Sequence, residues 1–349
     1  MRADRTVTHP PTPLLPVRVP LPGRTLRLWL KLEALGPFGS IKARTAEALL
    51  DALEEAGRLR PGDRVVESTS GNLGIALAGL CAARGYRCTL VVEPSTPRAS
   101  VTLMTEYGAD VVTVPELPSG RTLDARLEAV KDILRQDDTA VWTDQYESSA
   151  NPRVHTTRTA VELARDAPSG GFDAVAVAVS TGGTLAGVAD YFRAHRPSTR
   201  IIAVDAVGSA ALGGTPVHRP DKLAGFGSGR ASRFVARRHW DRLVRIRDLD
   251  AVAACARIRE RTGLSLGGSA GASVLATVMD AARRPGTADA ACVCPDGGDK
   301  YPQLTGVVTR NPEGVTAEVA AALDALGHAR CDEYAHPGTP PVTEGVAKP

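Results

Sequence analysis

The stretch Gly36-Pro37-Phe38-Gly39-Ser40-Ile41-Lys42 places a lysine directly after a Gly/Ser turn, at the start of a helical stretch. A lysine in that position lies near the positive end of the helix dipole and loses part of its hydration, and both effects lower the pKa of its amine. A neutral amine is the form that attacks a carbonyl group to give a Schiff base. A solvent-facing lysine in a first helical turn is the structural alternative for the heptapeptide alone.

The chain around this turn alternates short, Val-rich apolar runs with longer helical stretches, which is typical of an α/β fold built on parallel sheets. We expect strands over Leu26–Leu32, Arg64–Glu67, Cys88–Val92, Asp110–Val114, Ala174–Ser180, Ile201–Asp205 and Ala291–Cys294. We expect helices over Arg44–Gly57, Leu73–Arg84, Ala99–Tyr107, Leu123–Arg135, Arg153–Arg165, Thr184–His195, Ala251–Thr262 and Ala270–Arg283. Ligands of such folds bind beyond the carboxyl ends of the strands, so the strand-to-helix turns should carry the chemistry.

One of these turns, Ser180-Thr181-Gly182-Gly183-Thr184, follows an apolar run and opens a helix. Its two glycines let backbone N–H groups approach a ligand closely, and its three hydroxyls add donors, so it can bind a phosphate without a cation. It has no Walker-loop lysine and no GxGxxG pattern, so a phosphate monoester fits better than a nucleotide. A plain turn with a serine N-cap is the structural alternative.

Two further turns carry hydroxyl groups at helix starts. Glu67-Ser68-Thr69-Ser70-Gly71-Asn72 can offer N–H and O–H donors to a small carboxylate and a side-chain amide to a ring hydroxyl. Gly267-Gly268-Ser269-Ala270-Gly271 places Ser269 at another helix start, where it fits equally well as an N-cap. Capping alone is a poor explanation for four such turns on one chain.

Composition narrows the class of protein. The 349 residues are 43% hydrophobic and 23% charged, as in ordinary globular proteins, and no apolar run approaches the roughly 20 residues that span a bilayer. A net charge of +3, spread along the chain, argues against nucleic acid as a partner. The six cysteines show no zinc spacing, so we expect no metal site. The N-terminus lacks the apolar core of a secretory signal, and we infer a cytoplasmic protein.

The four turns in this order, with Pro295-Asp296-Gly297-Gly298-Asp299-Lys300-Tyr301 near the end, resemble those of the fold-type II pyridoxal-phosphate enzymes, the cysteine synthase and cystathionine β-synthase superfamily. The resemblance extends from about Pro11 to Tyr301. It implies a two-lobed α/β fold like that of the tryptophan synthase β subunit, each lobe a mostly parallel sheet flanked by helices. It also implies pyridoxal 5′-phosphate as cofactor, amino acids as substrates, and a homodimer.

The resemblance also implies roles for individual residues. Lys42 would carry the cofactor as an internal aldimine and move the proton at Cα, Asn72 would contact the ring hydroxyl, and Ser269 would face the pyridine nitrogen. The phosphate would lie on Ser180, Thr181, Gly182, Gly183 and Thr184, and the substrate carboxylate on Thr69, Ser70, Gly71 and Gln145. A neutral hydroxyl at the pyridine nitrogen makes a weaker electron sink than a carboxylate, which favours β-elimination through an α-aminoacrylate over transamination.

Some positions depart from a sulfide-using cysteine synthase, among them Ala43 and Leu73, where an aspartate and a threonine are usual. They are more similar to N-(2-amino-2-carboxyethyl)-L-glutamate synthases, which join O-phospho-L-serine to glutamate on the way to 2,3-diaminopropionate. There an arginine, a tyrosine and a serine bind the second substrate, and Arg126, Tyr146 and Ser180 match them. A solvated arginine on a polar helix face is the structural alternative for Arg126.

The function implied is therefore β-replacement on an activated L-serine by an amino acid such as L-glutamate, for siderophore or peptide-antibiotic biosynthesis. Cysteine synthase, cystathionine β-synthase and serine/threonine dehydratase activities remain alternatives, as does a non-catalytic phosphate-binding protein. We expect residues 1–40 and 148–327 to form a larger, cofactor-binding lobe and residues 41–147 a smaller lobe that binds the substrate carboxylate. The long stretch Val207–Arg238 is predicted to cover the active site, and residues 328–349 to form a disordered tail.

Overall fold

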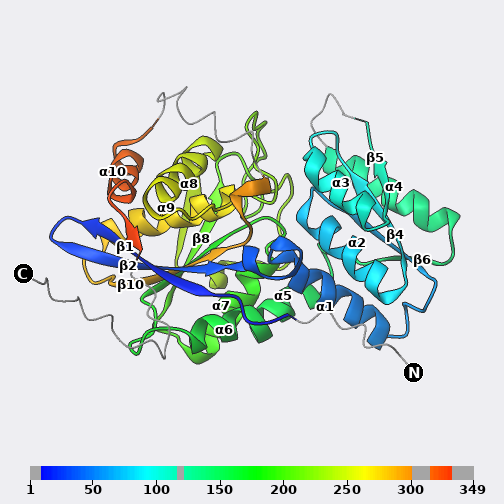
Figure 1. The fold of residues 1–349 in the computed structure, drawn as a ribbon, viewed down its shortest axis with the longest axis horizontal. Coiled ribbons are helices and arrows are strands. Elements are labelled where there is room, and N and C mark those ends of the chain that lie inside the picture. The colour runs from blue at the N-terminus through cyan, green and yellow to red at the C-terminus, as the bar shows by residue number, and fades with distance from the viewer. Residues whose placement is uncertain (1–8, 116–121, 301–314, 332–349) are drawn as a thin grey trace, which may run out of the picture.

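The computed structural model describes residues 9–115, 122–300 and 315–331 of the chain. Figure 1 shows two lobes side by side, each with its own sheet and its own helices. The larger sheet has seven strands in the order β11-β1-β2-β10-β7-β8-β9, and the smaller has four in the order β5-β4-β3-β6. The predicted two-lobed α/β architecture is confirmed.

The larger sheet is parallel except at one edge, where β1 runs antiparallel to both β2 and β11. Its strands are β1 (Leu14–Leu21), β2 (Arg24–Leu32), β7 (Ala174–Ala178), β8 (Arg200–Ala206), β9 (Arg242–Ile246), β10 (Asp289–Cys294) and β11 (Arg330–Cys331). The helices of this part of the chain are α5 (Ala150–Val154), α6 (Ala160–Arg165), α7 (Gly183–His195), α8 (Asp248–Thr262), α9 (Gly268–Arg283) and α10 (Ala317–Leu326).

The smaller sheet is parallel throughout. Its strands are β3 (Arg64–Ser68), β4 (Arg87–Val92), β5 (Asp110–Thr113) and β6 (Ala140–Trp142). The helices of this part of the chain are α1 (Lys42–Glu55), α2 (Asn72–Arg84), α3 (Arg98–Glu106) and α4 (Thr122–Gln136).

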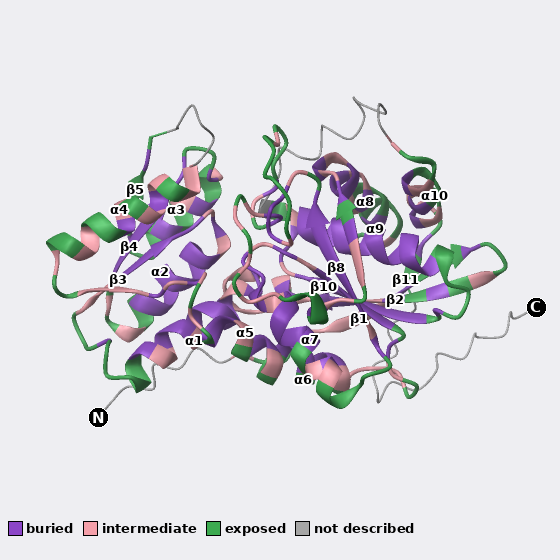
Figure 2. Cartoon of the chain, turned by 180° about the vertical axis from the view of Figure 1, so that it is seen from behind, coloured by how far each residue is buried: buried purple, intermediate pink, exposed green. Residues whose placement is uncertain are grey.

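Helices pack on both faces of each sheet, and the central strands β3, β4, β7, β8 and β10 are almost entirely buried, as Figure 2 shows. In the larger lobe, Leu28 of β2 and Ile202 of β8 belong to one core, and Val177 of β7 packs with Val188 of α7 in another. Burial on both faces explains why the strands are continuous apolar runs rather than alternating ones.

Every predicted strand and helix is present within a few residues of its expected bounds, with one internal exception. The predicted helix Arg153–Arg165 is instead α5, a π-helix over His155–Thr159, and α6. The prediction of one continuous α-helix there was wrong. Helix α7 packs so closely at this point that a Cβ on Gly187 would lie 2.2 Å from the Pro152 carbonyl oxygen, a tertiary contact that helical periodicity does not reveal.

Strands β1, β6, β9 and β11 and helix α10 were not predicted. Pro16 and Pro20 interrupt β1, and a proline has no N–H for a strand ladder, so the sequence pattern argued against a strand there. Strand β11 lies within the range predicted as a tail, whose remainder, residues 332–349, is outside the described residues. The lobe boundaries remain predictions. None of the helices in the described ranges is long and apolar enough to cross a membrane.

Each sheet reverses its winding direction at one point, and these two points define where a ligand can bind. In the smaller sheet, β4 and β5 lie on one side of β3 and β6 lies on the other; in the larger, β8 and β9 lie on one side of β7 and β10 on the other. Connections that leave such neighbouring strands in opposite directions open a crevice beyond their carboxyl ends. The turns after β3, β6, β7 and β10 should therefore meet in space.

A substitution at Gly79, in helix α2, tests how the turn before Lys42 packs against this helix. A Cβ there would lie 2.2 Å from Cε1 of Phe38, which precedes Lys42 in the turn. Gly79→Ala should therefore lower the free energy of unfolding by about 1–3 kcal/mol, although Gly→Ala usually stabilises an open helix position. Urea denaturation measures this. Gly170→Ala, with no atom near the new methyl group, is the control, and equal stability of both variants would contradict the packing.

Candidate active site

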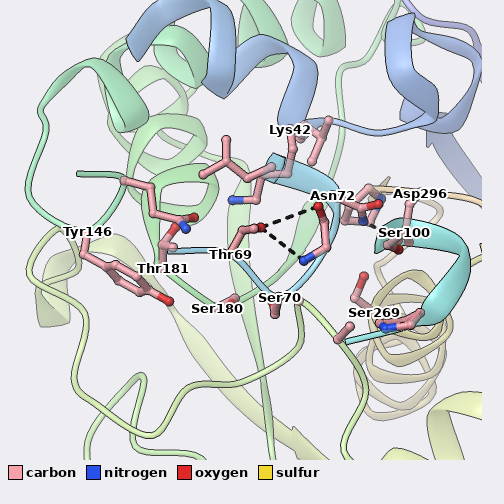
Figure 3. Close-up of a pocket in the computed structure, with 18 residues that line it drawn as sticks. Lys42, Thr69, Ser70, Asn72, Ser100, Tyr146, Ser180, Thr181, Ser269 and Asp296 are labelled. Atoms are coloured by element: carbon pink, nitrogen blue, oxygen red, sulfur yellow. Dashed lines mark hydrogen bonds between the residues drawn. The ribbon is translucent and has the colours of Figure 1, made fainter. Parts of the chain in front are cut away.

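The turns after β3, β6, β7 and β10 meet around one cavity (Figure 3). The predicted site residues that line it are Lys42, Thr69, Ser70, Gly71, Asn72, Gln145, Tyr146, Ser180, Thr181 and Ser269. The predicted residues that do not line it are Gly182, Gly183, Thr184 and Arg126. The sequence thus identified most of the lining, because strand-to-helix turns are a local pattern.

Several lining residues were not assigned a role from the sequence. Pro97 and Ser100 lie at the start of α3, in another strand-to-helix turn, so the same signal could have found them. Ala224 and Gly225 belong to the stretch predicted to cover the site, and Asp296 follows β10. Asp296 is part of a motif noted in the sequence, but nothing local indicated that its side chain faces a ligand.

Lys42 begins helix α1 and lines the cavity, so it is not a lysine on the outer surface. Burial lowers the pKa of its amine to about 8, and the nearby Glu67 carboxylate opposes this shift. The backbone on its N-terminal side is fixed to the other lobe, because the Ile41 N–H donates to the Pro295 carbonyl at 2.8 Å. The lysine is therefore held in place, and a substantial fraction of its amine is neutral near pH 8.

Glu67 joins the two strand ends that form the smaller lobe's side of the site. Its buried carboxylate accepts hydrogen bonds from the backbone of Ser68 and Gln145 and from the side chains of Thr143 and Trp142, at 2.6–3.3 Å. Burial nevertheless raises its pKa to about 7, with the hydrogen bonds opposing the rise. Through these bonds Glu67 fixes the loop after β3 against the loop after β6.

The loop after β3 is closed by the Thr69 hydroxyl, which accepts from the backbone N–H of Gly71 and of Gly74, each at 3.1 Å. Gly71 has a φ of +148°, a conformation that side-chain-bearing residues rarely adopt. Gln145 donates from Nε2 to the Ser68 carbonyl at 2.8 Å, so its amide lies against the same loop. The loop thus presents hydroxyls and backbone N–H groups at the N-terminus of α2, which suits a carboxylate.

The loop after β7 has the features of a phosphate site. Helix α7 begins at Gly183, and Gly182 before it has a φ of +92°. A Cβ would lie 2.1 Å from the Ser232 hydroxyl at Gly182, and 2.1 Å from the Asn151 amide oxygen at Gly183, so only glycine fits. The hydroxyl of Thr184 points away to His155 Nε2, 3.3 Å distant. The N-terminus of this 13-residue helix can bind an anion without a cation.

These groups fit pyridoxal phosphate. Lys42 with its desolvated amine, Asn72 and Ser269 line one cavity. Ser180 and Thr181, which lead into the glycine-bearing N-terminus of α7, line the same cavity. We propose that Lys42 binds the aldehyde carbon, that the loop Ser180–Thr184 holds the phosphate, and that Asn72 and Ser269 contact the ring.

Arg126 lies on α4, outside the cavity lining, and is only 4% exposed, so the alternative of a solvated arginine is wrong. Its Nη2 is 4.0 Å from a Glu93 oxygen, and its Nε and Nη1 make no hydrogen bond with any residue in the described ranges. The charge of Arg126 acts on the Tyr146 phenol, opposing the larger effect of burial, which raises its pKa. Arg126 is therefore within electrostatic range of a residue that does line the cavity.

The stretch Val207–Arg238 extends from the larger lobe and contacts the smaller one. Lys222 Nζ lies 3.4 Å from Glu93, and Arg230 Nη2 lies 3.0 Å from Glu147. The Arg230 guanidinium is also stacked 5.0 Å above the ring of Tyr146. Since Ala224 and Gly225 line the cavity, this stretch forms one wall of the site and is held against the other lobe by charge pairs.

Comparison with known proteins gives the family. A family model described as pyridoxal-phosphate dependent enzyme matches residues 6–296. The chain belongs to this family. It is 36% identical over 293 residues to N-(2-amino-2-carboxyethyl)-L-glutamate synthase of Ralstonia nicotianae, covering 83% of this chain and 85% of that one. It is 31% identical over 291 residues to cysteine synthase of Staphylococcus aureus, covering 83% and 92%.

Solved structures of related enzymes lead to the same family. The crystal structure of O-ureido-L-serine synthase matches with a TM-score of 0.74 at 29% identity, covering 89% of this chain and 96% of that one. Cysteine synthase of Entamoeba histolytica matches with a TM-score of 0.80 at 25% identity, covering 94% and 96%. The predicted cofactor, enzyme class and cysteine synthase-like fold are confirmed, and the alternative of a non-catalytic phosphate-binding protein loses its support.

If Lys42 binds the cofactor, borohydride reduction of the purified protein should fix the pyridoxyl group to Lys42 and to no other lysine. Peptide mass spectrometry locates the adduct. Because a neutral amine attacks the aldehyde, the rate of adduct formation by protein stripped of cofactor should rise with pH and level off above about 8, rather than above the usual 10.5. Lys42→Met should carry no adduct, and an adduct on Lys31 or Lys222 would contradict the assignment.

Proposed function

We propose that this enzyme catalyses β-replacement on O-phospho-L-serine, with L-glutamate as the nucleophile, to give N-(2-amino-2-carboxyethyl)-L-glutamate on the way to 2,3-diaminopropionate for siderophore or peptide-antibiotic biosynthesis. The 36% identity to synthases of that name supports the reaction class, since it extends over 83% of the chain. The buried Arg126, with guanidinium nitrogens that lack partners among the described residues, is the observation that carries the choice of an anionic nucleophile.

In the first half of the reaction, the loop Thr69–Gly71 binds the carboxylate of the serine substrate. The loop lies at the N-terminus of α2, whose partial positive charge favours a bound carboxylate. Pyridoxal phosphate, when bound, supplies the electron sink that lets the substrate lose its Cα proton. Lys42, with a pKa of about 8, can accept that proton and later return it near neutral pH.

The second half of the reaction requires a place for the side-chain carboxylate of glutamate. A guanidinium that is buried without hydrogen-bond partners is costly, so a site that keeps one is expected to gain an anionic ligand. At 4.0 Å, Glu93 compensates the charge of Arg126 only in part. Tyr146, whose pKa is influenced by the charge of Arg126, lines the cavity, and Ser180 lines it on the other lobe, so both can take part in binding this substrate.

Cysteine synthesis is the second candidate, and one observation favours it. Among the cavity-lining residues of the described chain, Lys42 is the only cation. A cavity of this kind suits a small nucleophile such as sulfide, which needs no carboxylate site. Cysteine synthase of Staphylococcus aureus, at 31% identity, also belongs to the relatives.

Product analysis separates the two candidates. Purified enzyme is incubated with O-phospho-L-serine and, in parallel, with glutamate, sulfide or homocysteine, and the products are identified by mass spectrometry. We expect an adduct of serine Cβ with the glutamate nitrogen, formed at least about tenfold faster than cysteine at equal concentrations. Cysteine as the main product would return cysteine synthesis to first place.

Arg126→Ala tests the glutamate site. Loss of a charged hydrogen-bond partner typically costs about 2–4 kcal/mol, so the glutamate concentration for half-maximal rate should rise about 30-fold or more. The first half-reaction, followed by stopped-flow absorbance with O-phospho-L-serine alone, should stay near the wild-type rate because it uses the loop Thr69–Gly71.

Arg135→Ala is the matched control for this variant. Arg135 lies on the same helix, with its side chain 59% exposed and paired with Glu128 and Asp132, so its loss should change neither half-reaction. If Arg126→Ala lowered the rates of both half-reactions equally, or left the glutamate concentration for half-maximal rate unchanged, Arg126 would not belong to the second-substrate site.

We further propose that the enzyme acts in the cytoplasm as a homodimer, as the family resemblance implies. Cys81, Cys88, Cys292 and Cys294 are buried and form no disulfides, which suits a reducing compartment. Sedimentation of the purified protein would measure the oligomeric state.

A further inference from the structure

Asn151, on helix α5, is a fully buried polar residue that no step of the proposed reaction uses. Its side-chain Nδ2 donates to the Gln145 carbonyl at 2.7 Å and to the Thr181 hydroxyl at 3.3 Å. Gln145 lies in the turn after β6 and Thr181 in the turn after β7, and both line the cavity. Asn151 therefore connects the turn proposed for the substrate carboxylate to the turn proposed for the cofactor phosphate.

The Gln145 carbonyl determines which way the Asn151 amide faces. A carbonyl oxygen only accepts hydrogen bonds, so the amide atom that lies 2.7 Å from it must be the nitrogen. This nitrogen has two N–H groups, and its two partners use both of them. Because an amide nitrogen does not accept hydrogen bonds, the Thr181 hydroxyl oxygen must be the acceptor of the second bond.

The Thr181 hydroxyl therefore keeps its own hydrogen for another partner. Its other hydrogen bond is also one that it accepts, from the Gly183 N–H at 3.5 Å. Within the described part of the chain, this hydroxyl donates to no residue. Thr181 is only 6% exposed, yet it lines the cavity (Figure 3). A buried O–H group without an acceptor is costly, so the geometry favours an acceptor in the cavity, such as a phosphate oxygen.

The surroundings of Asn151 keep its amide in this orientation. The carbonyl that it binds is itself held in place, because the Gln145 N–H donates to the Glu67 carboxylate at 3.0 Å. On the other side, a Cβ at Gly183 would overlap the Asn151 amide oxygen. The glycine thus lets the amide approach the loop closely enough to reach the Thr181 hydroxyl.

We propose that Asn151 is a positioning residue for the cofactor phosphate: by donating to the Thr181 oxygen, it directs the Thr181 O–H toward a phosphate oxygen of bound pyridoxal phosphate. Asn151 does not line the cavity and acts through Thr181. The inference rests on the loop Ser180–Thr184 holding the phosphate, which is part of the proposed site, and not on which nucleophile the enzyme uses.

A double-mutant cycle with two ligands tests this proposal. Thr181→Val, Asn151→Ala and the double variant are purified as holoenzymes, stripped of cofactor, and titrated with pyridoxal phosphate. Parallel titrations use pyridoxal, which has the same ring and aldehyde but no phosphate. Thr181→Val should raise the Kd of pyridoxal phosphate about tenfold and Asn151→Ala about three- to tenfold, whereas the double variant should match Thr181→Val. The Kd of pyridoxal should stay at the wild-type value in all three.

Two further variants separate positioning from folding. Asn151→Asp keeps the shape of the side chain but lacks the NH₂ group, so it should show the same selective loss, and it replaces Asn151→Ala in the cycle if that variant does not fold. Ser149→Ala changes an exposed residue whose side chain makes no capping hydrogen bond, and it should bind both ligands as wild type does.

Three results would overturn the proposal. If the Asn151 variants weakened both ligands equally, or neither, Asn151 would not act on the phosphate. If the losses multiplied in the double variant, Asn151 would not act through Thr181. If Thr181→Val left the Kd of pyridoxal phosphate unchanged, the phosphate would not lie on this hydroxyl, a result that leaves the choice of nucleophile untouched.

Discussion

The site depends on keeping the Lys42 amine away from bulk water. An amine with a pKa near 8 can act as a nucleophile and a proton carrier near neutral pH, whereas one at the usual 10.5 is almost always charged. The pKa of the amine falls this far only if the amine is buried, and it stays buried only if the surrounding elements are rigid. The structure provides both conditions by placing the lysine at the first position of a helix between two sheets, with the preceding residue hydrogen-bonded to the opposite lobe.

The start of helix α1 is anchored by a buried ionic network two residues after the lysine. Arg44 donates to Glu33 at 2.8 Å and forms a bidentate pair with Glu162, and Lys31, fully buried, lies 2.7 Å from Glu162. Two cations and two carboxylates balance, so the network fixes the helix without adding net charge near Lys42. Buried pairs are tolerated because every charge has partners. The network connects α1 to α6 and to the turn after β2.

The groups at the cavity and those further out differ in charge. The groups proposed to hold the cofactor and the substrate carboxylate are neutral donors: hydroxyls, amides and backbone N–H groups at helix N-termini. The cations other than Lys42 lie further out, in Arg126, Lys222 and Arg230, each near a glutamate. Because these donors are neutral, burial remains the larger cause of the lowered pKa of the lysine amine, and Glu67 opposes it. Of these three cations, Arg126 is the one that we propose for the site of a second, anionic substrate.

The sequence by itself determined the strand-to-helix turns, the lysine, most of the cavity lining and the family. These follow from local signals: a glycine or hydroxyl at a helix start, and an apolar run that fixes a strand. It could not reveal that β1 forms despite Pro16 and Pro20, or that a π-helix interrupts the predicted helix at His155–Thr159. The π-helix lies where helix α7 packs closely, whereas β1 pairs along its whole length with the neighbouring strand β2.

Only the tertiary structure decided which side chains face one another. It placed Arg126 behind the cavity rather than in it, and it brought Asp296 within 2.7 Å of Asn72. The spacing of apolar residues in the sequence indicates which face of its own helix or strand a residue lies on. Burial, hydrogen-bond partners and pKa shifts depend instead on which distant segment packs against it, and the winding reversals of two separate sheets decide that.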